Sequence, residues 1–150
     1  MSASSKLPEL TVYCHQNAIK LSDKLIQRLE SAGREALPKA LAVARSQESA
    51  LLLLDEVEIS LIDDEAIADV HLRFMDIPGA TDVITFDHGE IHISVETAQS
   101  QATEFQNDFE RELALYIVHG LLHLAGHEDA SDEGAARMDE LQVTILDQVW

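Results

Sequence analysis

The sequence predicts a single α/β (α+β) domain in which a small mixed sheet is packed by helices. A length of 150 residues suits one domain, and a hydrophobic fraction of 46% suits a folded core. Segments that alternate apolar and polar residues are followed by segments with helical spacing of apolar residues. We expect the domain to span residues 1–150, with residues 1–8 as a flexible tail.

The first elements follow from local patterns. Residues 10–14 (LTVYC) are rich in β-branched and aromatic side chains and predict a strand. Ser22 is a suitable N-cap for a helix, because apolar residues recur at helical spacing after it. Pro38 is expected to interrupt this helix, with a second helical piece reaching Arg45.

The remaining elements are predicted in the same way. The alternation in 57–62 predicts a strand, and Asp63 and Asp64 are good caps for a short helix after it. The pattern then predicts a hairpin of residues 83–86 and 90–95, a helical region from residue 96 with a helix that ends near 125, and a last helix capped by Ser131.

The charge is strongly acidic, with a formal net charge of −18. Such a protein repels polyanions, so the average charge argues against nucleic acid and against an anionic membrane surface. The charge is uneven, however: seven of the 10 Lys and Arg residues lie within residues 1–50. The first third is slightly basic, and the other two thirds are acidic.

The sequence also indicates the cellular compartment in which the protein is expected to work. Its single cysteine, Cys14, cannot form an internal disulfide, which is typical of a reducing environment. The start of the chain lacks the apolar core of a signal peptide, and the longest apolar run, 50–54, is too short for a membrane span. We expect a cytoplasmic protein with no membrane partner.

Two histidines in the C-terminal half are candidate metal ligands. His119 and His123 are four residues apart, so on a helix they share one face and can bind one metal ion. The leucines between and beside them predict an apolar environment, in which unpaired imidazoles are costly. The sequence therefore predicts a metal site on this helix.

A third ligand requires the helix to end. If it continued, His119 and His127 would lie about 12 Å apart along the axis, too far to share an ion. Gly126 permits a left-handed turn that returns the chain toward the metal. The candidates are then His127, Glu128 and Asp129.

These residues resemble a known family. Residues 119–126 match the pattern H-G-x-L-H-L-x-G-Y-D-H of the YbeY family of metal-dependent endoribonucleases, also called rRNA maturation factors. Residues 81–86 (TDVITF) and 89–91 (GEI) are similar to its T-[DN]-V-L-S-F and G-[DE]-I segments. The resemblance covers residues 10–148.

The resemblance implies a function and a ligand set. It implies a zinc-dependent, single-strand-specific endoribonuclease that matures the 3′ end of small-subunit rRNA and acts in ribosome quality control, with single-stranded ribosomal RNA as substrate and ribosomal or assembly proteins as possible partners. His119 and His123 are the implied catalytic ligands of one Zn²⁺ ion. Asp129 takes the position of the third histidine, with His127 as the fallback ligand and otherwise an exposed residue.

The chain departs from the family at a catalytic arginine. Met75 occupies that position, and Arg73, two residues away, is a candidate substitute. We assign Thr81, Asp82 and Phe86 a mainly structural role in a turn and strand beside the site.

Two other functions are compared with the nuclease. Metzincin proteases place a catalytic Glu after the first histidine, where this chain has Gly120, so peptide hydrolysis is disfavoured. The alternative is a ribosome-assembly or binding factor with a structural metal and little nuclease activity, which the acidic charge and Met75 favour.

Overall fold

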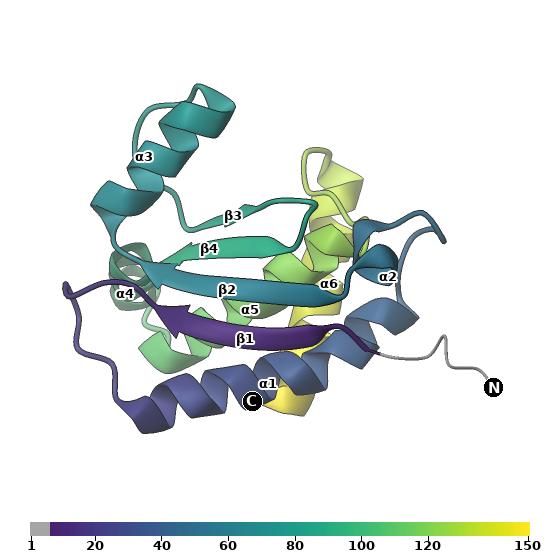
Figure 1. Ribbon diagram of the computed structural model, residues 1–150, viewed down its shortest axis with the longest axis horizontal. Coiled ribbons are helices and arrows are strands. Elements are labelled where there is room, and N and C mark those ends of the chain that lie inside the picture. The colour runs from purple at the N-terminus through teal and green to yellow at the C-terminus, as the bar shows by residue number, and fades with distance from the viewer. Residues whose placement is uncertain (1–6) are drawn as a thin grey trace.

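The computed structural model describes residues 7–150, which form four strands and six helices (Figure 1). In chain order these are β1 (Glu9–Cys14), α1 (Asp23–Ala42), α2 (Ala50–Leu53), β2 (Glu56–Ile62), α3 (Asp64–Met75), β3 (Val83–Thr85), β4 (Glu90–Ser94), α4 (Val95–Glu104), α5 (Phe109–Leu124) and α6 (Asp132–Val149). The predicted tail falls largely on residues 1–6, outside the described part, while Pro8 is buried. Within residues 7–150, no helix combines the length and apolarity needed to cross a bilayer.

The strands form one mixed sheet, which confirms the predicted fold class. Their order is β1-β2-β4-β3, with β1, β2 and β4 parallel and β3 antiparallel to β4. The antiparallel pair is the predicted hairpin, in which Ile84 lies opposite His92. Parallel neighbours need a crossover, and α1 and α3 lie in the connections that supply it.

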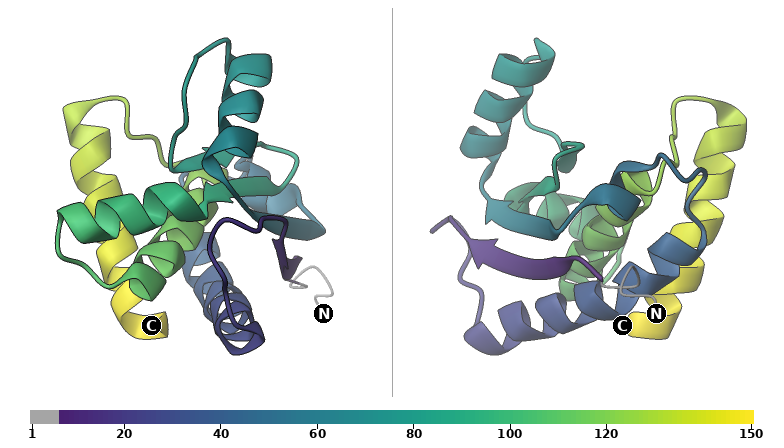
Figure 2. Two further views of the ribbon diagram at one scale, coloured as in Figure 1. Left: turned by 90° about the vertical axis from the view of Figure 1, so that its left-hand side faces the viewer. Right: turned by 45° about the vertical axis from the view of Figure 1, so that its right-hand side comes forward.

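One face of the sheet carries the main core. Alternate residues of β1, β2 and β4 point toward α1 and α5, which cover this face, and α6 packs on these two helices (Figures 1 and 2). On the other face, a smaller cluster joins Ile62, Ile67 and Ile84 beneath α3. The period-two pattern of β2 is therefore that of a strand with one well-buried face.

The outer edge of β1 is covered by two side chains of α1. The backbone N–H of Val12 donates to Glu30 Oε2 at 3.0 Å, and Arg34 Nε donates to the carbonyl of Leu10 at 3.1 Å. Glu30 and Arg34 also form an ion pair at 2.9 Å. These contacts satisfy edge groups that no neighbouring strand pairs on this side.

One local prediction is wrong, and one short helix was not predicted. Pro38 does not interrupt α1, which continues through it to Ala42. Pro38 is exposed, so the carbonyl that loses its helical donor can be hydrated, while buried Leu37 and Ala40 hold the helix on the core. The short helix α2, in the apolar run, was not predicted, because four residues are too few to show a helical period.

Helix α3 stands out from the sheet and buries little of its apolar surface (Figure 2). Ile67 is its one buried residue. Near its C-terminal end, Leu72 is 51% exposed and Phe74 is 64% exposed. This end of α3 is therefore a surface feature and not part of the core.

Gly120 is required where α5 crosses β4. A Cβ at this position would lie 2.8 Å from two side-chain carbons of Ile91, which is fully buried. We expect Gly120→Ala to lower the free energy of unfolding by about 1–3 kcal/mol, as overpacking does. Chemical denaturation of both proteins measures this difference.

Ile91→Val provides the control, because it removes one of the crowded carbons. The double variant should lose less stability than the sum of the two single variants. If Gly120→Ala instead stabilised the chain, as helix propensity alone predicts, close packing at this position would be disproved.

Candidate metal centre

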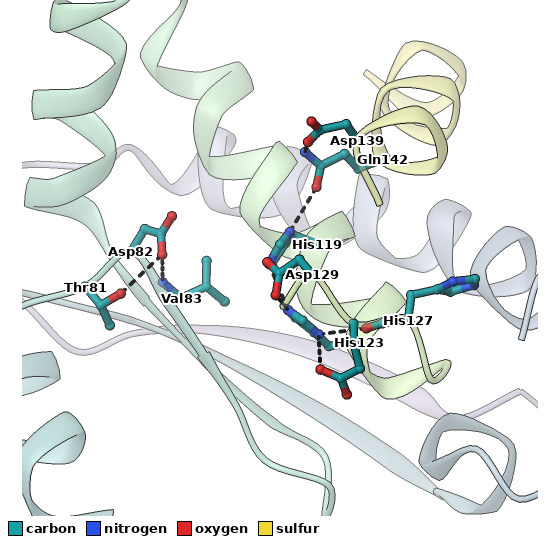
Figure 3. Close-up of polar contacts among 10 residues, drawn as sticks. Thr81, Asp82, Val83, His119, His123, His127, Asp129, Asp139 and Gln142 are labelled. Atoms are coloured by element: carbon teal, nitrogen blue, oxygen red, sulfur yellow. Dashed lines mark hydrogen bonds and ion pairs between the residues drawn. The ribbon is translucent and has the colours of Figure 1, made fainter. Parts of the chain in front are cut away.

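Helix α5 presents both predicted histidines on one face, beside the loop that leads to α6 (Figure 3). The helix begins at the N-cap Asp108, whose side chain accepts from the N–H of Arg111 at 3.1 Å. His119 and His123 have side chains that are 23% and 21% exposed, so both rings are mostly desolvated. The prediction of a largely buried helix is confirmed, and both imidazoles on it are partly buried.

A Schellman turn ends α5 and redirects the chain. Gly126 has φ +97°, its N–H donates to the carbonyl of His123, and the N–H of His127 donates to the carbonyl of Leu122. A Cβ at Gly126 would also meet Ser49 Oγ at 2.8 Å. Both the backbone angle and the close approach therefore require glycine, as predicted for the end of this helix.

After this turn, Asp129 comes back beside the two imidazoles. His119 Nε2 and His123 Nε2 lie 3.0 Å apart. One carboxylate oxygen of Asp129 is 3.7 Å from His119 Nε2, and the other is 3.9 Å from His123 Nε2. These three residues could hold a metal ion, because their ligand atoms all lie within 4.8 Å of one another.

The distances fit a tetrahedral ion. Donors that each lie about 2.1 Å from such an ion are about 3.4 Å from one another. The two Nε2 atoms are 3.0 Å apart, and the nearest Asp129 oxygens, a different one for each histidine, are at 3.7 and 3.9 Å, so a small shift of the carboxylate reaches that value. The Asp129 side chain is 46% exposed, so the group is open to solvent on the carboxylate side.

Hydrogen bonds at the other ring nitrogens favour metal binding. His123 Nδ1 lies 2.8 Å from the carbonyl oxygen of His127, an acceptor only, so Nδ1 carries the proton. His119 Nδ1 lies 2.9 Å from Gln142 Oε1. When both rings are neutral, their Nε2 atoms direct lone pairs toward each other. A cation bound between these atoms removes this repulsion.

The pKa of His123 is shifted in the direction that suits a ligand. Burial lowers the pKa of this imidazole, and the neighbouring His119 lowers it further. Asp129 and Glu128 oppose this shift but do not reverse it. The ring is therefore neutral at pH 7 and available for coordination.

His127 is directed away from this group (Figure 3). It is 5% exposed, and its Nε2 donates to the carbonyl of Val43, just after α1, at 2.7 Å. The expectation that it is an exposed residue is wrong, because the Schellman turn folds its ring inward. The structure does not bring it to the ligand group as the fallback ligand.

Glu128 lies near the side of His123 that faces away from the ligand group. Its carboxylate is 3.8 Å from His123 Nδ1, and its side chain is 76% exposed. Glu128 is thus a surface carboxylate beside His123 Nδ1, and it does not contact the Nε2 atom that faces His119.

The other predicted site residues lie elsewhere. Arg73 is on α3, where its side chain is 66% exposed and pairs with Asp69 at 3.2 Å. Asp82 accepts from the N–H of Val83 at 2.8 Å and from Thr81 Oγ1 at 3.4 Å, contacts that shape the turn into β3. These contacts support the structural role assigned to Thr81 and Asp82.

Two residues of α6 that support the site were not predicted. Gln142 Nε2 donates to Asp139 Oδ1 at 3.3 Å, which turns Gln142 Oε1 toward His119 Nδ1. The amide therefore fixes the ring orientation and tautomer of His119. Only the helical spacing of Asp139 and Gln142 is visible in the sequence, and nothing there connects them to a histidine 23 residues earlier.

We expect Gln142→Leu to weaken metal affinity by about 10- to 100-fold, because His119 loses its acceptor. Competition with a chromogenic chelator measures the affinity. Gln142→Glu should keep most of it, and Gln148→Leu, a matched change on the exposed side of α6, should leave it unchanged. Equal affinities for Gln142→Leu and the parent chain would refute the role of Gln142.

The fold and site together define an α/β protein with a two-histidine, one-aspartate group able to hold a metal. A family model described as Endoribonuclease YbeY matches residues 13–150. The chain belongs to the YbeY family, which confirms the resemblance found in the sequence.

Relatives and a solved structure agree with this assignment. An endoribonuclease YbeY of Mycolicibacterium smegmatis is 33% identical over 132 residues, which cover 74% of each chain. One from Caldanaerobacter subterraneus is 28% identical and covers 86% of this chain and 96% of its own. One from Nocardia farcinica is 35% identical over 112 residues, and the match spans 61% of its length. A solution structure from Thermotoga maritima superposes with a TM-score of 0.61, at 27% identity, over 94% of this chain and 89% of that one.

Proposed function

We propose that this chain is a zinc-dependent, single-strand-specific endoribonuclease that acts in the cytoplasm in ribosomal RNA maturation, at the 3′ end of small-subunit rRNA, and in ribosome quality control. The observation that carries the proposal is the convergence of His119, His123 and Asp129 in a chain of the YbeY family. The relatives are named as endoribonucleases, which supports RNA as the substrate.

The three ligands suit zinc and leave room for catalysis. Two imidazoles and one carboxylate are typical of zinc sites, and a catalytic site keeps a further position for water or substrate. Held by His119, His123 and Asp129, a zinc ion would supply Lewis-acid chemistry and would activate water at neutral pH. With one carboxylate, the loaded site carries a net charge of +1.

The charge of the site answers the objection raised by the acidic composition. The net charge of −18 repels a polyanion at long range. A local cation can nevertheless bind one phosphodiester, and the exposed side of Asp129 leaves the group accessible. The isolated protein should therefore bind RNA weakly and in a metal-dependent way.

The proposal is tested with purified chain and a labelled single-stranded RNA. Cleavage should be present with zinc, stop after treatment with a chelator, and return when zinc is added. A duplex of the same sequence should resist cleavage. Activity that survives removal of the metal, or that cuts the duplex equally well, would refute a zinc-dependent single-strand nuclease.

A second candidate is an assembly factor with a structural metal. The position of Arg73 favours it, because this arginine pairs with Asp69 on its own exposed helix instead of lying at the ligand group. Under this alternative, removing zinc lowers the melting temperature, and the zinc-loaded chain binds ribosomal subunits or their proteins without cutting RNA.

A further inference from the structure

Four ring side chains meet where α3 approaches the turn between β3 and β4, and we call them the ring cluster. Phe74 contacts Phe86 edge-on, with ring centroids 5.4 Å apart. His88 stacks on Phe86 at 5.5 Å with an angle of 16° between the planes, and His92 meets Phe86 edge-on at 5.7 Å. The cluster thus joins the C-terminal end of α3 to the β3–β4 hairpin.

The outer rings of the cluster are open to solvent. Phe74 is 64% exposed, and the His88 side chain is also 64% exposed. Phe86 is half-buried, and the His92 side chain is only 16% exposed. The inner rings therefore anchor the cluster, while Phe74 and His88 offer ring surface that the core does not use.

A carboxylate holds the two imidazoles in place. The two oxygens of Glu90 lie 3.0 Å from His88 Nε2 and 3.1 Å from His92 Nε2. The hydrogen bond from His88 lowers the pKa of the Glu90 carboxyl, which burial opposes. This bridge fixes the plane of His88 against Phe86, so the exposed stack is ordered before any ligand arrives.

A cation lies beside the exposed phenylalanine. The guanidinium carbon of Arg73 is 5.7 Å from the centre of the Phe74 ring. Arg73 is the only basic residue between Arg45 and Arg111 in the sequence. Its side chain is 66% exposed, so it can reach a ligand next to the rings while it remains near Asp69.

We propose that the ring cluster binds an unpaired nucleobase of single-stranded RNA by stacking, with Arg73 contacting the adjoining phosphate. Exposed rings beside a cation are the recurring means of binding unstacked bases and the backbone between them. Stacking supplies affinity that the acidic surface cannot supply through charge. This inference rests on the proposed nuclease function and gives Arg73 a binding role.

The position of the cluster suits a strand that also reaches the metal centre. Phe86 directly follows β3, and β3 packs against α5, which carries His119 and His123. In Figure 1, α3 rises on one side of the β3–β4 hairpin and the loop between α5 and α6 rises on the other. A bound strand that crosses this hairpin can therefore contact the rings and the metal centre together.

The test places a fluorescent ring in the cluster. Phe74→Trp, loaded with zinc, is titrated with a 2′-O-methyl RNA strand, whose integrity is checked on a denaturing gel. Stacking of a base should quench the new tryptophan. The control is Phe105→Trp: Phe105 is 62% exposed and, within residues 7–150, makes no ring contact. Its emission should not change, and Trp150 provides the common background.

An abasic strand separates stacking from charge. Phe74→Leu should weaken binding of the RNA about tenfold, because the stacking of one base is lost. Binding of an abasic strand of equal length should not differ between Phe74→Leu and the parent. In the cleavage assay, Phe74→Leu should raise KM and leave kcat unchanged.

Three results would overturn the stacking site. The first is that RNA does not quench the emission of Phe74→Trp. The second is that Phe74→Leu binds the intact RNA as tightly as the parent does. The third is that Phe74→Leu loses as much affinity for the abasic strand as for the intact strand. Zinc-dependent cleavage together with any of them would refute the inference and leave the proposed function standing. Base-dependent binding through Phe74 without cleavage would refute the nuclease reaction and leave the stacking site standing.

Discussion

His123→Ala should lose zinc and RNA cleavage together. The ring supplies one of three ligands, and only His119 and Asp129 would remain. Because loss of a residue that merely orients a ligand costs 10- to 100-fold in affinity, loss of the ligand itself should cost at least about a hundredfold. Metal content after dialysis and the rate of cleavage measure the two losses.

The controls distinguish a lost ligand from a damaged fold. His15→Ala changes an exposed histidine just after β1 and should retain zinc and activity. In the presence of a chelator, the melting temperature of His123→Ala measures what the metal-free fold loses with the ring and with its hydrogen bond to the His127 carbonyl at 2.8 Å, and the variant should remain folded. A variant that keeps one zinc per chain, or that cuts RNA as fast as the parent, would disprove this site.

Asp129→Ala and His127→Ala should have opposite effects. Asp129→Ala removes a ligand from an exposed loop, so zinc content should fall while the metal-free chain keeps its stability. His127→Ala removes the donor to the Val43 carbonyl, which lies 2.7 Å from Nε2, and leaves this half-buried acceptor and the space of the buried ring without a partner. We expect a loss of about 1–3 kcal/mol in unfolding free energy with zinc content unchanged.

Metal analysis and thermal denaturation of both variants provide the measurements. Asp129→Asn is a useful third variant, because it keeps the size of the side chain and removes its charge, and it should also lose zinc. If His127→Ala released zinc and Asp129→Ala retained it, the ligand set would be His119, His123 and His127.

The sequence contained most of the site, because its main features are local. His119 and His123 are related by helical spacing, and Gly126 shows where the helix must turn. From sequence alone His127 and Asp129 remained alternatives, since their directions depend on how the turn at Gly126 packs against Ser49. Only the fold buries one and leaves the other beside the imidazoles.

Features that depend on distant partners were not predictable. Gln142 supports His119 because α6 packs on α5, and no local pattern announces that contact. Pro38 was expected to break α1, yet the buried neighbours of this residue hold the helix together. The ring cluster likewise joins Phe74 of α3 to Phe86 and His88 of the β3–β4 turn.

The contacts that Glu30 and Arg34 of α1 make with the edge of β1 affect how copies of the chain can associate. An open strand edge can add a strand from another molecule, which is a common route to aggregation. Here the Val12 N–H and the Leu10 carbonyl are already bonded to α1. Helix α1 therefore prevents another molecule from adding a strand at the edge of β1. The chain has this protection only after α1 has packed against the strand.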